Sequence, residues 1–104
     1  MTPTKADKEN IKKRLVESLR DQKEIDKIII FGSFLKEDEP GDIDLAIFQN
    51  SKENYIELSL RYRKMIRSVS KEIPVDVIPI MSAKSNDFIV NEIECGEVIF
   101  ERGN

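Results

Sequence analysis

A short apolar segment that ends in Gly-Ser, followed by an Asp-x-Asp sequence, is the feature that most limits how this chain can fold. The apolar residues 28–31 lead directly into Gly32 and Ser33, and an eight-residue spacer separates this pair from Asp42-Ile43-Asp44. Because side chains alternate across a strand, Asp42 and Asp44 point to one face, about 6.5 to 7 Å apart. The sequence therefore predicts a strand that carries two carboxylates on one of its faces.

These two carboxylates suit hard divalent cations. Mg²⁺ prefers oxygen ligands and usually takes one or two carboxylates per ion, and water and substrate phosphates fill its remaining positions. We expect Asp42 and Asp44 to bind metal, and a nucleotide to supply the phosphates. The alternative is that both are solvated residues of an edge strand, the ordinary role of alternating polar positions.

A third aspartate lies in another apolar segment. Residues 74–80 read Pro-Val-Asp-Val-Ile-Pro-Ile, a composition that is typical of a short strand. An isolated buried carboxylate costs several kcal/mol of desolvation or takes up a proton, so Asp76 needs a partner or a metal. We predict that Asp76 is the third metal ligand and accepts the proton of an attacking hydroxyl. A structural ion pair with a lysine or arginine is the alternative.

Gly32 and Ser33 are suited to binding phosphate. Gly32 has no Cβ, so a triphosphate can approach its backbone closely. Ser33 offers a backbone N–H and a hydroxyl to a phosphate oxygen, and a helical turn over residues 34–37 would add free N–H groups at the same place. Lys36 is the nearby cation that we expect to contribute to nucleotide binding.

The succession of an apolar strand, Gly-Ser, a spacer, Asp-x-Asp and a later strand aspartate resembles the DNA polymerase β-type nucleotidyltransferase superfamily. More narrowly, the chain is similar to the minimal nucleotidyltransferases (MNT), small prokaryotic proteins encoded beside HEPN-domain partners. The similarity covers nearly the whole chain, up to a closing segment, residues 96–101, that is like the family's last strand. The resemblance implies the α/β nucleotidyltransferase fold.

The resemblance also implies a role for each motif residue. Gly32 and Ser33 match the phosphate-binding pair, Asp42 and Asp44 the metal-binding pair, and Asp76 the third carboxylate. Two Mg²⁺ ions held by the three aspartates would align ATP, and AMP would pass to a hydroxyl of another macromolecule. The implied partner is a HEPN toxin encoded by a neighbouring gene, which would make this chain its antitoxin.

The spacer between Gly-Ser and Asp-x-Asp supports a second hypothesis. Residues 34–41 form a shorter spacer than is usual in MNT proteins, and Glu37, Asp38 and Glu39 stand where that family often has arginine. Fewer cations would then hold the triphosphate. The alternative is an MNT-like antitoxin with weak or no catalysis that acts by contact.

Composition narrows the remaining classes. A chain of 104 residues predicts one domain, residues 1–104, and its net charge of −3 argues against a broad nucleic-acid surface. We expect nucleic acid to be bound only through the partner. One cysteine and no histidine exclude an internal disulfide and the usual zinc sites. Without a signal stretch or a long apolar run, the protein is expected to be cytoplasmic and to cross no membrane.

Two other nucleotide-using classes do not fit. The glycine-rich P-loop sequence of many NTPases does not occur in the chain. Sugar-nucleotide glycosyltransferases also use Asp-x-Asp, but they need a larger nucleotide-binding domain than this chain provides.

Apolar periodicity and turn residues predict the element order αββαβαβ. Helices are expected from Thr4 to about Gln22, from Asn50 or Ser51 to about Ser70, and around residues 88–93, and strands at residues 25–31, 42–48, 73–80 and 97–101. This order indicates a small mixed sheet with helices packed on one face, a two-layer α/β (α+β) domain. The side chains of the second helix available for packing are Ile56, Leu58, Tyr62, Met65, Ile66 and Val69.

The second helix is also locally basic. Its cations are Arg61, Arg63, Lys64, Arg67 and Lys71. The last members of this series share one face of the helix, which is either solvated or available to a protein partner or RNA.

Overall fold

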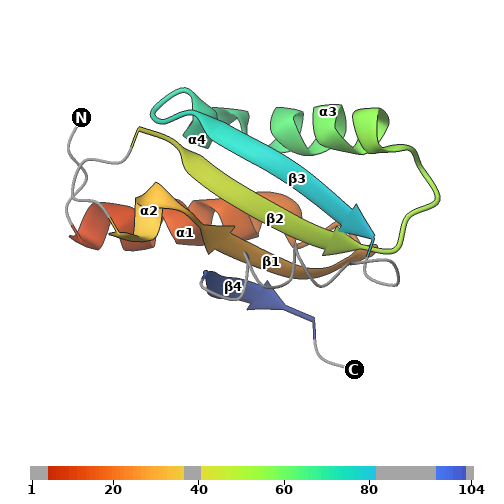
Figure 1. The fold of residues 1–104 in the computed structure, drawn as a ribbon, viewed down its shortest axis with the longest axis horizontal. Coiled ribbons are helices and arrows are strands. Elements are labelled where there is room, and N and C mark those ends of the chain that lie inside the picture. The colour runs from red at the N-terminus through yellow and green to blue at the C-terminus, as the bar shows by residue number, and fades with distance from the viewer. Residues whose placement is uncertain (1–4, 37–40, 82–95, 103–104) are drawn as a thin grey trace.

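The protein folds into a four-stranded mixed sheet with helices on one side (Figure 1). The computed structural model describes residues 5–36, 41–81 and 96–102. Its helices are α1 (Lys5–Leu19), α2 (Ser33–Lys36), α3 (Tyr55–Met65) and α4 (Arg67–Ser70), and its strands are β1 (Ile25–Phe31), β2 (Ile43–Gln49), β3 (Val75–Met81) and β4 (Glu97–Glu101). The strand order is β3-β2-β1-β4. β1 runs antiparallel to β2 and β4, and β2 runs parallel to β3, which confirms the predicted mixed sheet.

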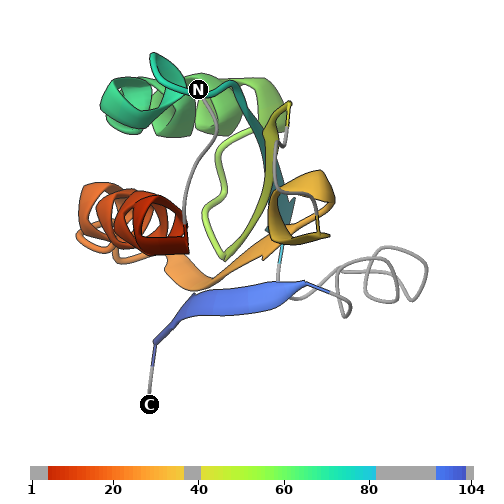
Figure 2. The same ribbon diagram turned by 90° about the vertical axis from the view of Figure 1, so that its left-hand side faces the viewer.

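Helices α1, α3 and α4 cover the same face of the sheet, as Figure 2 shows. The main core lies between these helices and the sheet. Its fully buried strand residues include Ile28, Ile30, Leu45 and Ile47, which alternate along β1 and β2. Because side chains alternate in a strand, the residues next to these, such as Ile29 and Ala46, face away from the helices. The predicted two-layer arrangement, with the described long helices on one face, is confirmed.

Helix α1 buries the stripe that the sequence predicts. Ile11, Leu15 and Leu19 are spaced by four and are all buried. The helix ends at Leu19, earlier than the predicted Gln22, because the chain turns there: the N–H of Gln22 bonds to the carbonyl of Leu19, 3.0 Å away. The predicted cap residue Thr4 lies outside the described residues.

The predicted helix from residue 50 to 70 is in fact two helices. It begins later than expected because Asn54 is the cap, with its side chain accepting the N–H of Glu57 at 2.9 Å. It is interrupted at Ile66, whose backbone leaves the helical region while its side chain is fully buried. The expectation that Ile56 packs in the core is wrong, because its side chain is 69% exposed on the outer side of α3.

The strand predictions hold closely. β1 and β4 have the predicted bounds, whereas β2 begins one residue later than predicted, so that Asp42 immediately precedes the strand. The helix expected around residues 88–93 lies outside the described residues. Within the described part of the chain, no helix has the length and apolar character that crossing a bilayer requires.

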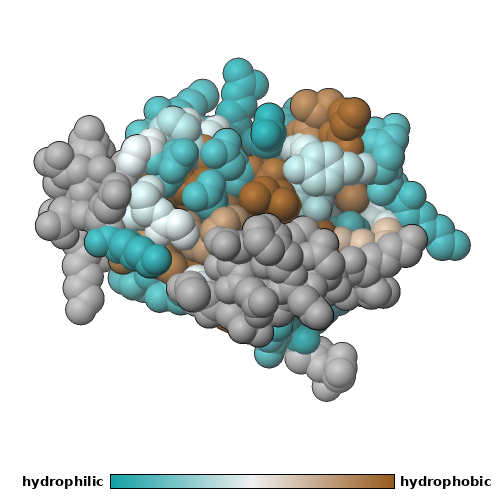
Figure 3. Space-filling model, in the orientation of Figure 1, coloured by the Kyte–Doolittle hydropathy of each residue, from teal (hydrophilic) through white to brown (hydrophobic). Residues whose placement is uncertain are grey.

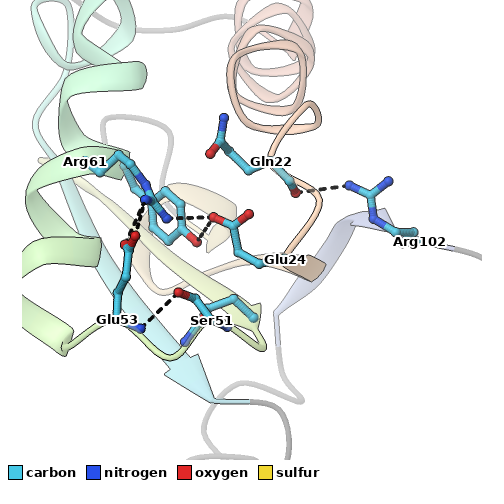
Figure 4. A network of polar contacts seen from close by, with 8 residues as sticks. Gln22, Glu24, Ser51, Glu53, Arg61 and Arg102 are labelled. Carbon is cyan, nitrogen blue, oxygen red and sulfur yellow. Dashed lines mark hydrogen bonds and ion pairs between the residues drawn. The ribbon is translucent and has the colours of Figure 1, made fainter.

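A charged network fastens α3 to the beginning of β1 (Figure 4). The Tyr62 hydroxyl donates to Glu24 Oε1 at 3.0 Å, and Arg61 Nη2 approaches the same oxygen at 2.8 Å. Arg61 Nη1 also pairs with Glu53 at 2.7 Å. Arg61 is therefore already engaged within the protein, and it does not belong to an open basic face. Burial and then the Glu24 carboxylate raise the pKa of Tyr62, so its hydroxyl stays protonated and continues to donate.

We expect Tyr62→Phe to lower the free energy of unfolding by about 1.5 kcal/mol, because it removes a hydrogen bond to a charged acceptor and keeps the buried ring. Urea denaturation measures this change. Tyr55→Phe is the matched control, since Tyr55 is 55% exposed, and its effect should stay within about 0.5 kcal/mol. Equal effects of the two substitutions would contradict a stabilising role for the network.

Candidate functional site

The register of the sheet aligns two of the predicted site residues. Asp44 of β2 lies opposite Phe31 of β1 on one side and opposite Asp76 of β3 on the other. Directly opposed residues share a face of a sheet, so the three side chains form one row. This row is on the face away from the long helices, because the neighbouring Leu45 belongs to the core beneath them. Asp42, two residues before Asp44, comes to the same end of the sheet.

The three predicted aspartates converge. Asp42, Asp44 and Asp76 each offer a carboxylate oxygen, and these oxygens all lie within 4.8 Å of one another. Asp42 and Asp44 are half-buried, and Asp76 is exposed. Three oxygens at this separation can be bridged by hard cations, and each aspartate would keep further coordination positions open to water or phosphate. The donor set therefore fits Mg²⁺.

The ionised form of Asp44 is disfavoured within this cluster. Its pKa is raised, first by burial and then by the negative charges of Asp42 and Asp76. Both effects disfavour the ionised form, and a bound cation would reverse the charge repulsion. Burial and two acidic neighbours therefore both disfavour the negative charge of Asp44.

Two constraints favour glycine at position 32: its backbone conformation and the nearness of the Asp44 side chain. Its φ is +81°, a left-handed value that other residues adopt at a cost. A Cβ at this position would lie 2.3 Å from Asp44 Oδ2. The glycine therefore lets the turn after β1 pass directly beside the acidic cluster, a contact that depends on strand pairing and that the sequence alone did not predict.

Ser33 and Lys36 occupy the two ends of α2. Ser33 is the first residue of this short helix and is half-buried, and the predicted helical turn is present. Lys36 is its last residue and is exposed. Both belong to the segment that follows β1, at the end of the strand that lies beside Asp44. Their roles in binding a nucleotide stay predictions.

The expectation that Asp76 is a buried carboxylate is wrong, although the residue does join the cluster. Asp76 is exposed, not buried, because β3 is an edge strand with β2 as its only described neighbour. Its charge is therefore hydrated and needs no partner for stability. The exposure leaves one side of the cluster open to an approaching molecule.

An apolar surface that the sequence did not predict lies next to the carboxylates. Ile29, Ala46 and Ile80 form a second buried cluster on the face away from the helices, and Phe31 and Ile78 pack against it. Apolar surface is visible in the middle of this face (Figure 3). The sequence of β2 contains this pattern, since Asp44, Ala46 and Phe48 alternate and share one face of the strand. Whether that face meets other apolar residues depends on the register with β1 and β3.

We expect Gly32→Ala to destabilise the protein by more than the cost of about 1–2 kcal/mol for a left-handed alanine, because the new methyl group collides with Asp44. Gly41→Ala is the matched control, since a Cβ there meets nothing within 4 Å. In an Asp44→Ala background the collision is absent, so the cost of Gly32→Ala should fall. A double-mutant cycle by urea denaturation measures the coupling. Additive effects would contradict the close approach.

Asp44→Asn should stabilise the metal-free protein at neutral pH. The pKa of Asp44 is raised on folding, so the ionised side chain opposes folding above that pKa, and the penalty disappears as the pH falls through it. The melting temperature of Asp44→Asn should therefore exceed that of the wild type at pH 7 in EDTA, and the two temperatures should converge below the ordinary aspartate pKa of 3.8. Asp21→Asn, an exposed aspartate outside the cluster, should not show this pattern. If the difference in melting temperature between the two proteins instead increased at low pH, the charge of Asp44 would be stabilising.

Comparison with solved structures identifies the fold. A chain in the tri-AMPylated Shewanella oneidensis HEPN toxin–MNT antitoxin complex is 16% identical, with a TM-score of 0.67 and coverage of 91% of this chain and 73% of that one. A toxin–antitoxin complex with AMP-PNP gives 17% identity, a TM-score of 0.67 and coverages of 88% and 73%. A mutant MntA complex has two aspartates, two positions apart, changed to glutamate. Its matching chain is 15% identical, with a TM-score of 0.67 and coverage of 88% of this chain and 73% of that one.

Sequence comparison gives the family. Among curated proteins, none matches this sequence. The family model described as "Polymerase beta, Nucleotidyltransferase" matches residues 13–104, nearly the whole chain. The likeness to the solved complexes, at these identities, establishes a shared fold. With the family match and the convergent aspartates, it leads to one conclusion: the chain belongs to the polymerase β nucleotidyltransferase family.

Proposed function

We propose that this protein is a Mg²⁺-dependent nucleotidyltransferase that moves AMP from ATP to a hydroxyl of a partner protein. The observation that carries the proposal is the convergence of Asp42, Asp44 and Asp76, whose oxygens lie within 4.8 Å, in a chain of the nucleotidyltransferase family. The position of Gly32 against Asp44 adds a backbone turn at the same place.

The three aspartates would hold two Mg²⁺ ions. When bound, these ions supply positive charge that aligns the triphosphate and stabilises the leaving pyrophosphate. Asp44, half-buried and central in the row, contributes a charge that a bound cation would stabilise. Asp42 and Asp76 flank it and extend the oxygen surface over which two ions can be shared.

The turn after β1 would bind the phosphates. Gly32 leaves the backbone accessible, and Ser33 offers its N–H and hydroxyl to a phosphate oxygen. Lys36, exposed at the end of α2, can reach an anion from the solvent side. These contacts position the α-phosphorus relative to the aspartates, which is the main task of a protein in phosphoryl transfer.

Asp76 is the residue best placed to serve as the base. The acceptor oxygen attacks the α-phosphorus and forms a new P–O bond, while the bond to the bridging oxygen breaks and pyrophosphate leaves with its electron pair. The proton of the acceptor hydroxyl passes to the Asp76 carboxylate. Because Asp76 is exposed on an edge strand, the acceptor can approach it and the proton can then pass to water.

We assign the acceptor to a HEPN-domain protein encoded by a neighbouring gene, with this chain as the antitoxin that modifies it. The solved complexes of similar fold support this assignment, since one pairs an MNT antitoxin with a tri-AMPylated HEPN toxin and another contains AMP-PNP. The described part of this chain offers no second domain that could hold an acceptor.

The alternative is an antitoxin that neutralises the toxin by contact, with weak or no catalysis. The acidic residues Glu37, Asp38 and Glu39 in the spacer favour it, because they would oppose a triphosphate. The two functions differ in whether the aspartates are needed for neutralisation.

Incubation of the protein with Mg²⁺, ATP labelled at the α-phosphate and the purified HEPN-domain partner should label the partner, and the chain alone should give slow or no transfer. Asp44→Asn should lower transfer by orders of magnitude, because it removes a charge from the metal cluster. Ser33→Ala should lower it by about tenfold to a hundredfold, the equivalent of a charged hydrogen bond.

Asp21→Asn is the control for charge and should transfer at the wild-type rate. Wild-type transfer by Asp44→Asn would overturn the metal assignment. If a variant with Asn at all three aspartate positions silences the partner without labelling it, the contact-only antitoxin is the correct function.

A further inference from the structure

The outer side of α3 and α4 combines exposed aliphatic and basic side chains. We call the outer face the six residues Ile56, Leu60, Arg63, Lys64, Arg67 and Lys71. Ile56 is 69% and Leu60 is 62% exposed, the two largest exposed fractions among the large hydrophobic side chains of the described residues. Four-residue spacing puts the two on one side of α3, with Lys64 a further four residues along. In Figure 3, apolar surface appears at the edge occupied by α3, with hydrophilic surface towards α4.

The cations of this face have no acidic partner among the described residues. Lys12, Arg14, Lys27 and Arg61 form ion pairs within the described residues, whereas no such pair is seen there for the four basic residues of the outer face. Residues 55–71 contain five basic residues and one acidic residue, in a chain whose net charge is −3. The positive charge is therefore local to this face and stays uncompensated within the described structure.

We propose that the outer face is the docking surface for an acidic protein surface with an apolar centre, on the protein that supplies the acceptor hydroxyl. The inference rests on the proposed function for the identity of that protein. The chemistry of the face defines the occupant: the four cations call for carboxylates, and the two aliphatic side chains call for apolar contacts that exclude water.

Two other occupants fit the face less well. RNA would pair its phosphates with the cations but would leave Ile56 and Leu60 without an apolar partner. A second copy, in a two-fold symmetric dimer, would place this basic face against itself, and a head-to-tail contact with an acidic region would build a ring or an open chain of copies. A different, acidic protein satisfies both parts of the face.

The position of the face agrees with this role. Helix α3 lies along β3, the edge strand that carries Asp76 (Figure 1). Asp76 is exposed on that strand. A protein bound to the outer face can therefore extend past the edge of β3 to the carboxylate cluster, and docking there would bring its hydroxyl to the open side of the cluster.

The test measures binding of the purified HEPN-domain partner to the wild type and two variants by surface plasmon resonance at several salt concentrations. Arg63→Glu with Lys64→Glu should raise the dissociation constant about tenfold or more, and should weaken the fall of the association rate with rising salt. Leu60→Ser should raise the dissociation rate and leave the salt dependence unchanged. Both sites are exposed, and the melting temperature of each variant checks the fold.

Lys13→Glu with Lys23→Glu is the matched control, because it makes the same charge change at exposed positions outside the outer face. Its dissociation constant should stay within about twofold of the wild type. Tight binding by the Arg63/Lys64 variant, or equal loss by the control, overturns the inference while the partner assignment stands. Absence of any complex with the wild type overturns both. Labelled single-stranded RNA that competes with the partner for this face would replace protein docking with RNA binding.

Discussion

The pairing of β2 with both β1 and β3 is the constraint on which the site depends. β2 is antiparallel to one neighbour and parallel to the other, and the two registers together place Asp44 between Phe31 and Asp76. A slip of one residue in either pairing would turn Asp44 towards the core beneath α1 and α3. The register is secured because Leu45 and Ile47 are fully buried on the opposite face. The hydrophobic core therefore fixes the position of the acidic cluster.

Much of this arrangement could be predicted from the sequence. Periodicity located β1 and β4 correctly, and the apolar segment around Asp76 was recognised as a strand. These predictions succeed because alternating side chains depend on local sequence alone. The aspartates were grouped by their resemblance to a family pattern, and the structure shows them close together.

What could not be predicted depends on which segments become neighbours. The exposure of Asp76 follows from β3 being an edge strand. The order of strands in a sheet cannot be predicted from local sequence patterns. The contact between Gly32 and Asp44 likewise requires the hairpin register. The engagement of Arg61 with Glu24, 37 residues away in sequence, removes it from the basic face that the helix sequence suggested. Helix periodicity identifies the side of the helix on which a residue lies. It does not identify the residues that this side contacts in the fold.

The stabilising charges and the site charges lie at opposite ends of β1. Glu24, which accepts from Arg61 and Tyr62, immediately precedes the strand, whereas Phe31 and Gly32 at its other end adjoin Asp44. Opposite charges at the first end stabilise the fold, and like charges at the second end disfavour the ionised form of Asp44. Since seven residues of β1 separate the two groups, about 23 Å along an extended strand, changes at the aspartates act well beyond a Debye length from the network. Loss of transfer in an aspartate variant can therefore be attributed to the chemistry of the site, because the interactions that hold α3 to the sheet are left intact.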